Sequence, residues 1–356
     1  VYEKVIAGHP EALEVREKLA AIFAALEDSE MVLATLLELE KINPHRQETQ
    51  RRVAQIYLHR KQYSEAVDHY LKAFQIAKGS PQEYLNVAEL LRFERRADEA
   101  VEMLKRARFH YPEEVELLIE LAVSNIAADQ FGIAFTLFQE SENVAESLRP
   151  DLLDGMFYFS FGAAAERTKR YDEAESLFRK SISLTGEDVF PKVRARPFNY
   201  LGYMFLEQDK NFEEAGELIQ EANDLVPNDA SYVDSLGWYY FKVEEYPQAL
   251  RALLRAETLL TKELESDPVI FDHIAQAYFQ LGHRKEALAY IGKAIARDPD
   301  NEEYQSRKTS FEETAPPQKV PLDFLDAPQM DSSSGDGEST APAGDEQEIP
   351  EVPNTP

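Results

Sequence analysis

The chain has 356 residues, of which 44% are hydrophobic and 29% charged, so it has enough apolar material for a core and is not a disordered chain. Its 66 acidic residues outnumber 38 basic ones, and the net charge of −28 disfavours nucleic acid and anionic membrane surfaces as partners. The absence of cysteine excludes disulfides and thiolate sites, and no apolar run is long enough to span a bilayer.

Small residues and prolines recur at a fixed spacing through the first half of the chain. Alanines lie 34 residues apart at Ala66, Ala100 and Ala134, and closing prolines at Pro10 and Pro44 share this period. A period of 34 with these marks indicates helix pairs that repeat along the chain. Residues 1–10 match only the end of such a unit, so we expect an upstream repeat that is cut at the first residue.

The same marks continue in the second half, at less regular steps. The alanines there are Ala174, Ala215, Ala249 and Ala287. A Leu-Gly step precedes two of them, at Leu201-Gly202 and Leu236-Gly237. A small residue on each helix lets the two helices approach closely, and a proline ends the second helix because it has no amide hydrogen. The irregular steps predict insertions between helices.

This spacing predicts an all-α solenoid of stacked helix pairs. Its eight units are expected over residues 11–46, 47–80, 81–114, 115–150, 155–190, 195–229, 230–267 and 268–301. Residues 302–313 are expected to form a polar capping helix that covers the end of the stack. Residues 314–356 are rich in proline and acid, with a net charge of −8, which predicts a disordered tail.

The residues at these marks resemble the tetratricopeptide repeat family, and the resemblance covers all eight units. The stretch from Phe198 to Ala256, with its NYLGY and DSLGW segments, is similar to repeats common in bacterial members, many of them exported or envelope-associated. The resemblance implies a right-handed α-solenoid whose first helices line a concave groove. It also implies a scaffold that binds a peptide or a partner protein in that groove and needs no cofactor.

Candidate binding residues follow from positions that share one face of the first helices in units five to eight. These positions combine aromatic anchors with a few polar groups: Phe159, Asn199, Tyr203, Asp234, Trp238, Phe241, Asp272 and Phe279. Trp238 is the strongest single candidate, since tryptophan is enriched at binding hot spots. The alternative is that the aromatic side chains fill gaps between successive helices. The same positions of units two and three are polar, and we expect them to be solvated.

Two further segments suggest a second interaction. The insertion at residues 186–197 carries Lys192, Arg194 and Arg196 on an acidic body, and it could receive an acidic partner or the chain's own tail. Its alternative is an ordinary solvated loop. Within the tail, residues 320–328 place apolar side chains among acids, which suggests a segment that folds on binding and docks into the chain's own groove.

The sequence contains no catalytic motif. The seven histidines form neither a helical metal-binding pair nor a cluster, and Gly-rich phosphate loops and nucleophile elbows are absent. We therefore predict a non-enzymatic bacterial scaffold, with an accessory or substrate-presenting region of a larger enzyme or envelope assembly complex as the alternative. The periplasm or cell envelope is slightly favoured over the cytoplasm, and the oligomeric state is left open.

Overall fold

The computed structural model describes residues 12–260 and 268–325, and over these ranges it contains helices and no strand. Sixteen of the helices form eight pairs, which we number as units one to eight. The first or A helices are α2 (Leu13–Ala25), α4 (Gln47–His59), α6 (Pro81–Phe93), α8 (Val115–Ala127), α10 (Gly155–Arg167), α12 (Pro191–Glu207), α14 (Ala230–Lys242) and α16 (Val269–Gln280). The second or B helices are α3 (Ser29–Ile42), α5 (Tyr63–Ile76), α7 (Ala97–His110), α9 (Phe131–Leu148), α11 (Tyr171–Leu184), α13 (Phe212–Leu225), α15 (Tyr246–Thr258) and α17 (Arg284–Arg297).

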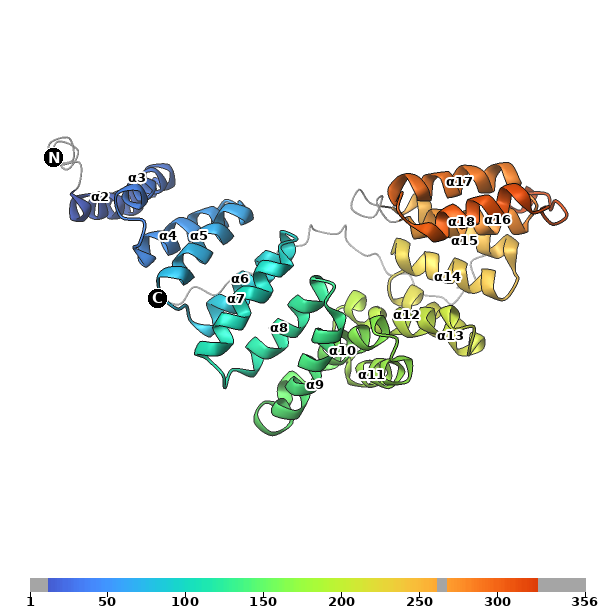
Figure 1. The fold of residues 1–356 in the computed structure, drawn as a ribbon, viewed down its shortest axis with the longest axis horizontal. Helices are drawn as coiled ribbons and strands as arrows, with labels where there is room; N and C mark the ends of the chain where they lie inside the picture. Colours follow the sequence, from blue (N-terminus) through green and yellow to red (C-terminus); the bar gives the residue numbers. More distant parts are fainter. Residues whose placement is uncertain (1–11, 261–267, 326–356) are drawn as a thin grey trace, which may run out of the picture.

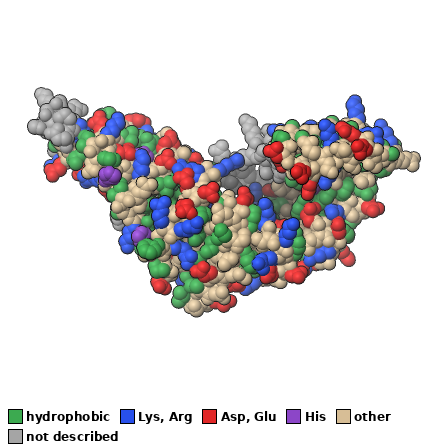
Figure 2. All heavy atoms as spheres, in the orientation of Figure 1, with side chains coloured by type: hydrophobic (Ala, Val, Ile, Leu, Met, Phe, Trp, Pro, Cys, Tyr) green, Lys and Arg blue, Asp and Glu red, His purple; other side chains and the backbone are tan. Residues whose placement is uncertain are grey.

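The helix pairs stack into a curved array. Each A helix packs on the B helix of its own unit, and successive units pack on one another along the chain. The array bends into an arch with units one to three in one arm and units seven and eight in the other (Figure 1). The molecular surface is hollowed between the two arms, and acidic and basic side chains are interspersed over the same view (Figure 2). The predicted all-helical solenoid is therefore confirmed.

The turn between the A and B helices has one conformation throughout. Each turn places a residue at positive φ, and the turn of unit six places two, Asp209 and Asn211. The first four positive-φ residues, Glu27, Lys61, Arg95 and Asp129, lie 34 residues apart. The next amide bonds back to a carbonyl five residues earlier, as in the 2.9 Å bond from Gln62 to Tyr57. This arrangement ends a helix and satisfies its last carbonyls. The period found in the sequence is thus also a period of the backbone.

The small residues of the repeat lie where the two helices of a unit touch. The alanine marks from Ala66 to Ala287 have no solvent exposure. A β-carbon added at Gly202 would lie 2.7 Å from Ile219, and one at Gly237 would lie 2.6 Å from Leu253. Such distances are too short for carbon atoms, so these two positions accept only glycine without a shift of the neighbouring helix.

Helix α12 differs from what the sequence predicts. The insertion at residues 186–197 is largely helical, because α12 begins at Pro191 and contains Pro197. This added turn packs through Ala195 on Ala222 and Tyr232 of the two following helices. We call residues 191–196 the α12 extension. Its proline at the start has the fixed φ that suits a first helical position, which favours helix over loop there.

Helix α18 (Glu302–Glu313) covers the last unit. Its Tyr304 and Phe311 are buried against α16 and α17, while most of its remaining side chains are exposed. The side chain of Asn301 accepts hydrogen bonds from the amides of Glu303 and Tyr304 and so caps the helix. Residues 302–313 therefore form the helix that the sequence predicts at this place.

Residues 314–325, which we call the strap, follow α18 and lie against unit eight and α15. The amide of Val320 donates to the carbonyl of Leu281 at 3.0 Å, and His283 Nε2 donates to the carbonyl of Val320 at 2.7 Å. The strap ends in a 3₁₀ turn, η2 (Asp323–Leu325), whose apolar side chains pack on the core of the last units. The sequence predicts a disordered tail from residue 314 onward, and this is wrong for residues 314–325, whose hydrogen bonds and apolar contacts hold them against unit eight. Residues 326–356 lie outside the described residues, as does the predicted partial repeat at residues 1–10.

Candidate functional site

The eight predicted binding residues lie on neighbouring A helices. Helices α10, α12, α14 and α16 contact one another in this order, so side chains far apart in sequence share one surface. Three of the aromatic residues are partly exposed: Phe159, Tyr203 and Phe241. The other five residues are buried: Asn199, Asp234, Trp238, Asp272 and Phe279.

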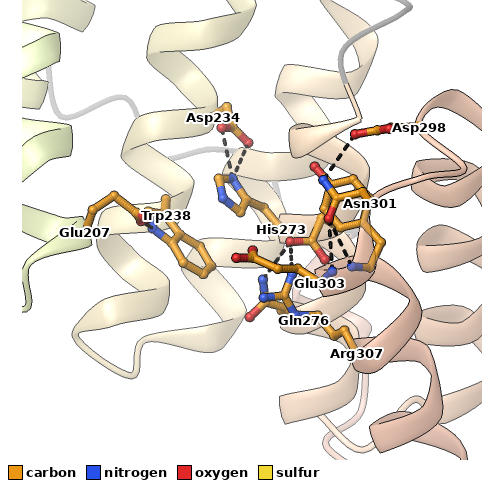
Figure 3. A network of polar contacts seen from close by, with 11 residues as sticks. Glu207, Asp234, Trp238, His273, Gln276, Asp298, Asn301, Glu303 and Arg307 are labelled. Atoms are coloured by element: carbon orange, nitrogen blue, oxygen red, sulfur yellow. Dashed lines mark hydrogen bonds and ion pairs between the residues drawn. The ribbon is translucent and has the colours of Figure 1, made fainter. Parts of the chain in front are cut away.

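Trp238 contacts residues of both neighbouring A helices, Glu207 of α12 and His273 of α16 (Figure 3). Its ring is parallel to that of His273, with the centroids 4.0 Å apart, and to that of Phe241 at 4.7 Å. Its indole Nε1 donates to Glu207 Oε1 at 2.8 Å. Only 7% of the residue is exposed, so the ring and the polar end of Trp238 contact mainly the protein's own side chains.

His273 pairs with Asp234 behind this stack. Its Nδ1 lies 3.0 Å from both carboxylate oxygens, and both residues are buried. Burial disfavours the charged ring, but the charge and hydrogen bond of Asp234, with weaker contributions from Asp272 and Glu207, outweigh it and raise the pKa of His273 above its usual value. Asp234, which the sequence predicts as a polar binding group, thus has an internal partner in His273.

The predicted residues of unit eight contact the capping helix. Asp272 forms an ion pair with Arg307 of α18 and accepts a 3.1 Å hydrogen bond from Gln276 (Figure 3). Phe279 stacks on Phe311 with the ring centroids 4.4 Å apart. These contacts place Asp272 and Phe279 in the junction between unit eight and its cap.

Phe159 and Asn199 lie at the other end of the surface. The ring of Phe159 makes an edge contact with Tyr200 at 5.0 Å, and Tyr200 is itself exposed. Asn199 lies one helical turn before Tyr203 on α12. Its buried Oδ1 has no hydrogen-bond partner among the described residues, which leaves one acceptor unused beside a partly exposed aromatic ring.

Comparison with known proteins identifies the repeat. Models of the tetratricopeptide repeat match residues 157–188 and 269–301, which correspond to units five and eight. The chain therefore contains tetratricopeptide repeats. A curated bacterial relative, the TPR repeat-containing protein PA4667 of Pseudomonas aeruginosa, is 28% identical over 164 residues, which are 45% of this chain. That match spans only 25% of the relative's own length.

A solved structure has the same tetratricopeptide-like architecture. The APC/C hetero-tetramer Cut9-Hcn1 contains a chain that superposes with a TM-score of 0.56 and 13% sequence identity. The superposition covers 82% of this chain and 58% of that one. At this identity the likeness concerns the fold alone.

The A helices of the first tetratricopeptide units are joined by ion pairs, contrary to the expectation of a solvated face. Arg51 of α4 lies 2.9 Å from Glu83 of α6, and Arg92 of α6 pairs with Glu120 of α8. Burial raises the pKa of Glu120, although the adjacent Arg92 opposes this rise. In the described part of the chain, the polar positions of one A helix thus hold the next A helix.

Sequence reasoning missed the partners that hold the candidate site together. Glu207, His273 and Arg307 each bond a predicted residue from another helix, at separations of 31 to 39 positions. A clue was available for His273, because it is the sequence neighbour of the predicted residue Asp272 on α16. No group of three residues that could hold a metal ion occurs in the described ranges, and no described helix is long and apolar enough to cross a membrane.

Proposed function

We propose that this protein is an interaction scaffold that binds an extended peptide or a helix of a partner protein on the A-helix face of units five to eight. The observation that carries the proposal is the row of partly exposed aromatic residues, Phe159, Tyr203 and Phe241, on three successive A helices. Large aromatic side chains that are already held in place bind with little loss of conformational freedom.

The proposal divides the predicted site residues into two groups. Phe159, Tyr203 and Phe241 would contact the partner, whereas Asn199 is buried one helical turn before Tyr203. Trp238 would act beneath them, because its stack with Phe241 fixes that ring and its bond to Glu207 fixes the distance between α14 and α12. Asp234, Asp272 and Phe279 would keep the A helices in place.

Two comparisons support a binding role. The tetratricopeptide architecture occurs in interaction scaffolds, and the Cut9 neighbour was solved as a hetero-tetramer with Hcn1. The alternative, an accessory region of a larger enzyme, requires a catalytic domain elsewhere in the full-length protein, and the full-length sequence tests it.

A binding experiment tests the proposed face directly. The chain would be used to capture a partner from bacterial lysate, and the affinity of the purified partner would then be measured for a Tyr203→Ala, Phe241→Ala variant. Loss of two such anchors should cost about 2 kcal/mol or more, which is roughly a 30-fold increase in Kd. A Phe93→Ala, Phe109→Ala variant is the matched control, since these side chains are 63% and 84% exposed on α6 and α7.

Crosslinking separates loss of contact from loss of stability. The chain has no cysteine, so Tyr203→Cys carries a crosslinker at a single position of the face, and Phe109→Cys carries it on a B helix. The proposal predicts a crosslink to the partner from position 203 and none from position 109. Equal Kd values for both alanine variants, together with crosslinks from position 109 alone, would place the partner elsewhere.

A further inference from the structure

Five basic residues lie on α15 and on the α12 extension, and the loop that precedes α14 contacts both of these elements. Arg251 and Arg255 are one turn apart on α15. Arg255 donates to the Pro227 carbonyl at 2.9 Å in the loop that precedes α14, and Asp229 of that loop lies 3.3 Å from Lys192 of the extension. Arg194 and Arg196 continue along the extension. We call Arg251, Arg255, Lys192, Arg194 and Arg196 the basic track.

Most of the track lacks a neutralising carboxylate. Within the described residues, no carboxylate lies within ion-pair distance of Arg194, Arg196, Arg251 or Arg255, and only Lys192 is paired. Arg251 and Arg255 bond instead to neutral carbonyl and amide oxygens. In a chain with a net charge of −28, guanidinium groups that lack a carboxylate partner attract a negatively charged segment.

The strap ends beside Arg251, which lies at one end of the basic track. The carbonyl of Phe324 accepts a hydrogen bond from Arg251, and the Arg251 guanidinium lies 6.0 Å from the centre of the Phe324 ring. Residues 326–356 follow directly, and they contain eight acidic residues and no lysine or arginine. An extended chain advances about 3.3 Å per residue, so the first ten of these residues could span about 33 Å.

We propose that the acidic segment 326–351 docks on the basic track of the same molecule. The observations that carry the proposal are the place where the strap ends, the opposite charges of the two segments and the length of chain that follows. Tethering favours this docking, because a short linker holds the segment at a high effective concentration beside the track. Long Arg and Lys side chains near the surface bind carboxylates weakly and reversibly, so the contact is sensitive to salt and open to competition by an acidic partner.

Energy transfer within the full chain tests the proposal. Trp238 is the only tryptophan and serves as donor, and Ser339→Cys provides a single labelling position for a dansyl acceptor in a chain without cysteine. Docking predicts efficient transfer at low salt and a marked fall in 1 M NaCl, where the screening length is about 3 Å. Arg194→Glu with Arg196→Glu should lower the transfer at low salt to the high-salt level.

Matched variants make the result specific. Arg95→Glu with Arg106→Glu changes the net charge equally in the turn after α6 and on α7, away from the track, and should leave the transfer unchanged. Asp331→Asn, Asp336→Asn and Glu338→Gln remove charges from the tail itself, outside the repeats, and should abolish the transfer as the track variant does.

Three outcomes would overturn the proposal. Transfer that is the same in the track variant, the tail variant and the parent would show that charge does not hold the segment there. An equal fall in the Arg95, Arg106 control would show a general effect of net charge. Transfer that rises with protein concentration would show docking between two copies instead of within one. Partner binding on the A-helix face is measured separately, so its failure is distinguishable from these results.

Discussion

At the scale of single residues, the candidate site is held together by ring stacking and hydrogen bonds between side chains of different helices. Trp238 illustrates this, because its ring stacks on His273 and Phe241 and its polar nitrogen is bonded to Glu207. In the proposed function, Trp238 would contribute to affinity by holding Phe241 in place more than by its own contact with a ligand. The A-helix face is thus organised in advance of binding, which lowers the entropy lost on association.

The buried His273 makes the stability of units seven and eight depend on pH. Its folded-state pKa is raised, so its contribution to the free energy of unfolding is complete below the unfolded value of about 6.5 and is lost as pH rises through the folded value. We expect the parent chain to lose more stability than His273→Gln between pH 6 and pH 9. Thermal unfolding at each pH measures the difference, with the exposed His110→Gln as control.

His69 tests the sign of this pH dependence, because its pKa is shifted in the opposite direction. Burial lowers its pKa, which Glu40 only partly opposes, so its contribution is present above about pH 6.5 and is lost as pH falls. The pH dependence removed by His69→Gln should therefore be opposite to that removed by His273→Gln. Identical slopes for the two variants would contradict the assignment of a charged His273 beside Asp234.

At the scale of the element, one turn design connects the helices of every unit. Its positive-φ residue is a non-glycine in seven of the eight units described, and glycine occurs only at Gly282. The left-handed conformation costs a residue with a β-carbon about 1–2 kcal/mol, whereas glycine adopts it freely and loses about 0.5–1 kcal/mol in chain entropy. The turns therefore retain strain that substitution can relieve.

Glycine at exposed turn positions should stabilise the array. We expect Lys61→Gly and Lys169→Gly each to raise the free energy of unfolding by about 0.5 kcal/mol, since both side chains are exposed and the turn is kept. Lys105→Gly, within helix α7, should instead lower it by about 1 kcal/mol. Urea unfolding measures all three, and a loss of stability in the two turn variants would show that the side chains matter there.

Gly282 predicts the opposite effect. A β-carbon at this position would be strained by the φ of 78° and would lie 2.6 Å from the backbone of Lys319 in the strap. We expect Gly282→Ala to destabilise unit eight and to release the strap. Faster amide exchange at Val320, whose amide bonds to Leu281, would report the release. Unchanged exchange there would show that the position of the strap does not depend on the conformation of the turn.

At the scale of the whole molecule, stability is a sum of units and of the contacts between them, so its ends are the weakest points. Helix α18 covers the C-terminal end through Phe311, which stacks on Phe279. We expect Phe311→Ala to cost about 3 kcal/mol locally and to speed amide exchange in α16 and α17. Exchange in α4 to α7 should not change, because that arm of the arch has its own core, and an equal rise there would indicate one cooperative unit.

The sequence by itself determined the repeat and the helix pairs. This information is local. The small size of Gly202 or Ala100 sets how closely two helices pack, a closing proline ends a helix, and the apolar period defines the buried face. Each of these effects operates within one unit or between neighbouring units. The same locality explains the correct prediction of the capping helix, which is polar except for the side chains that face the last unit. The α12 extension was missed because helix and loop are both compatible with a short basic segment that contains proline.

Only the tertiary structure decided which site residues face outward. Trp238 and Phe241 occupy equivalent positions on the face of one helix, and the sequence left open whether they bind a partner or fill gaps. Their exposure depends on His273, which comes from the next unit, and on the distance between successive A helices. That distance results from the packing of all side chains at the junction, and no residue of a single repeat specifies it.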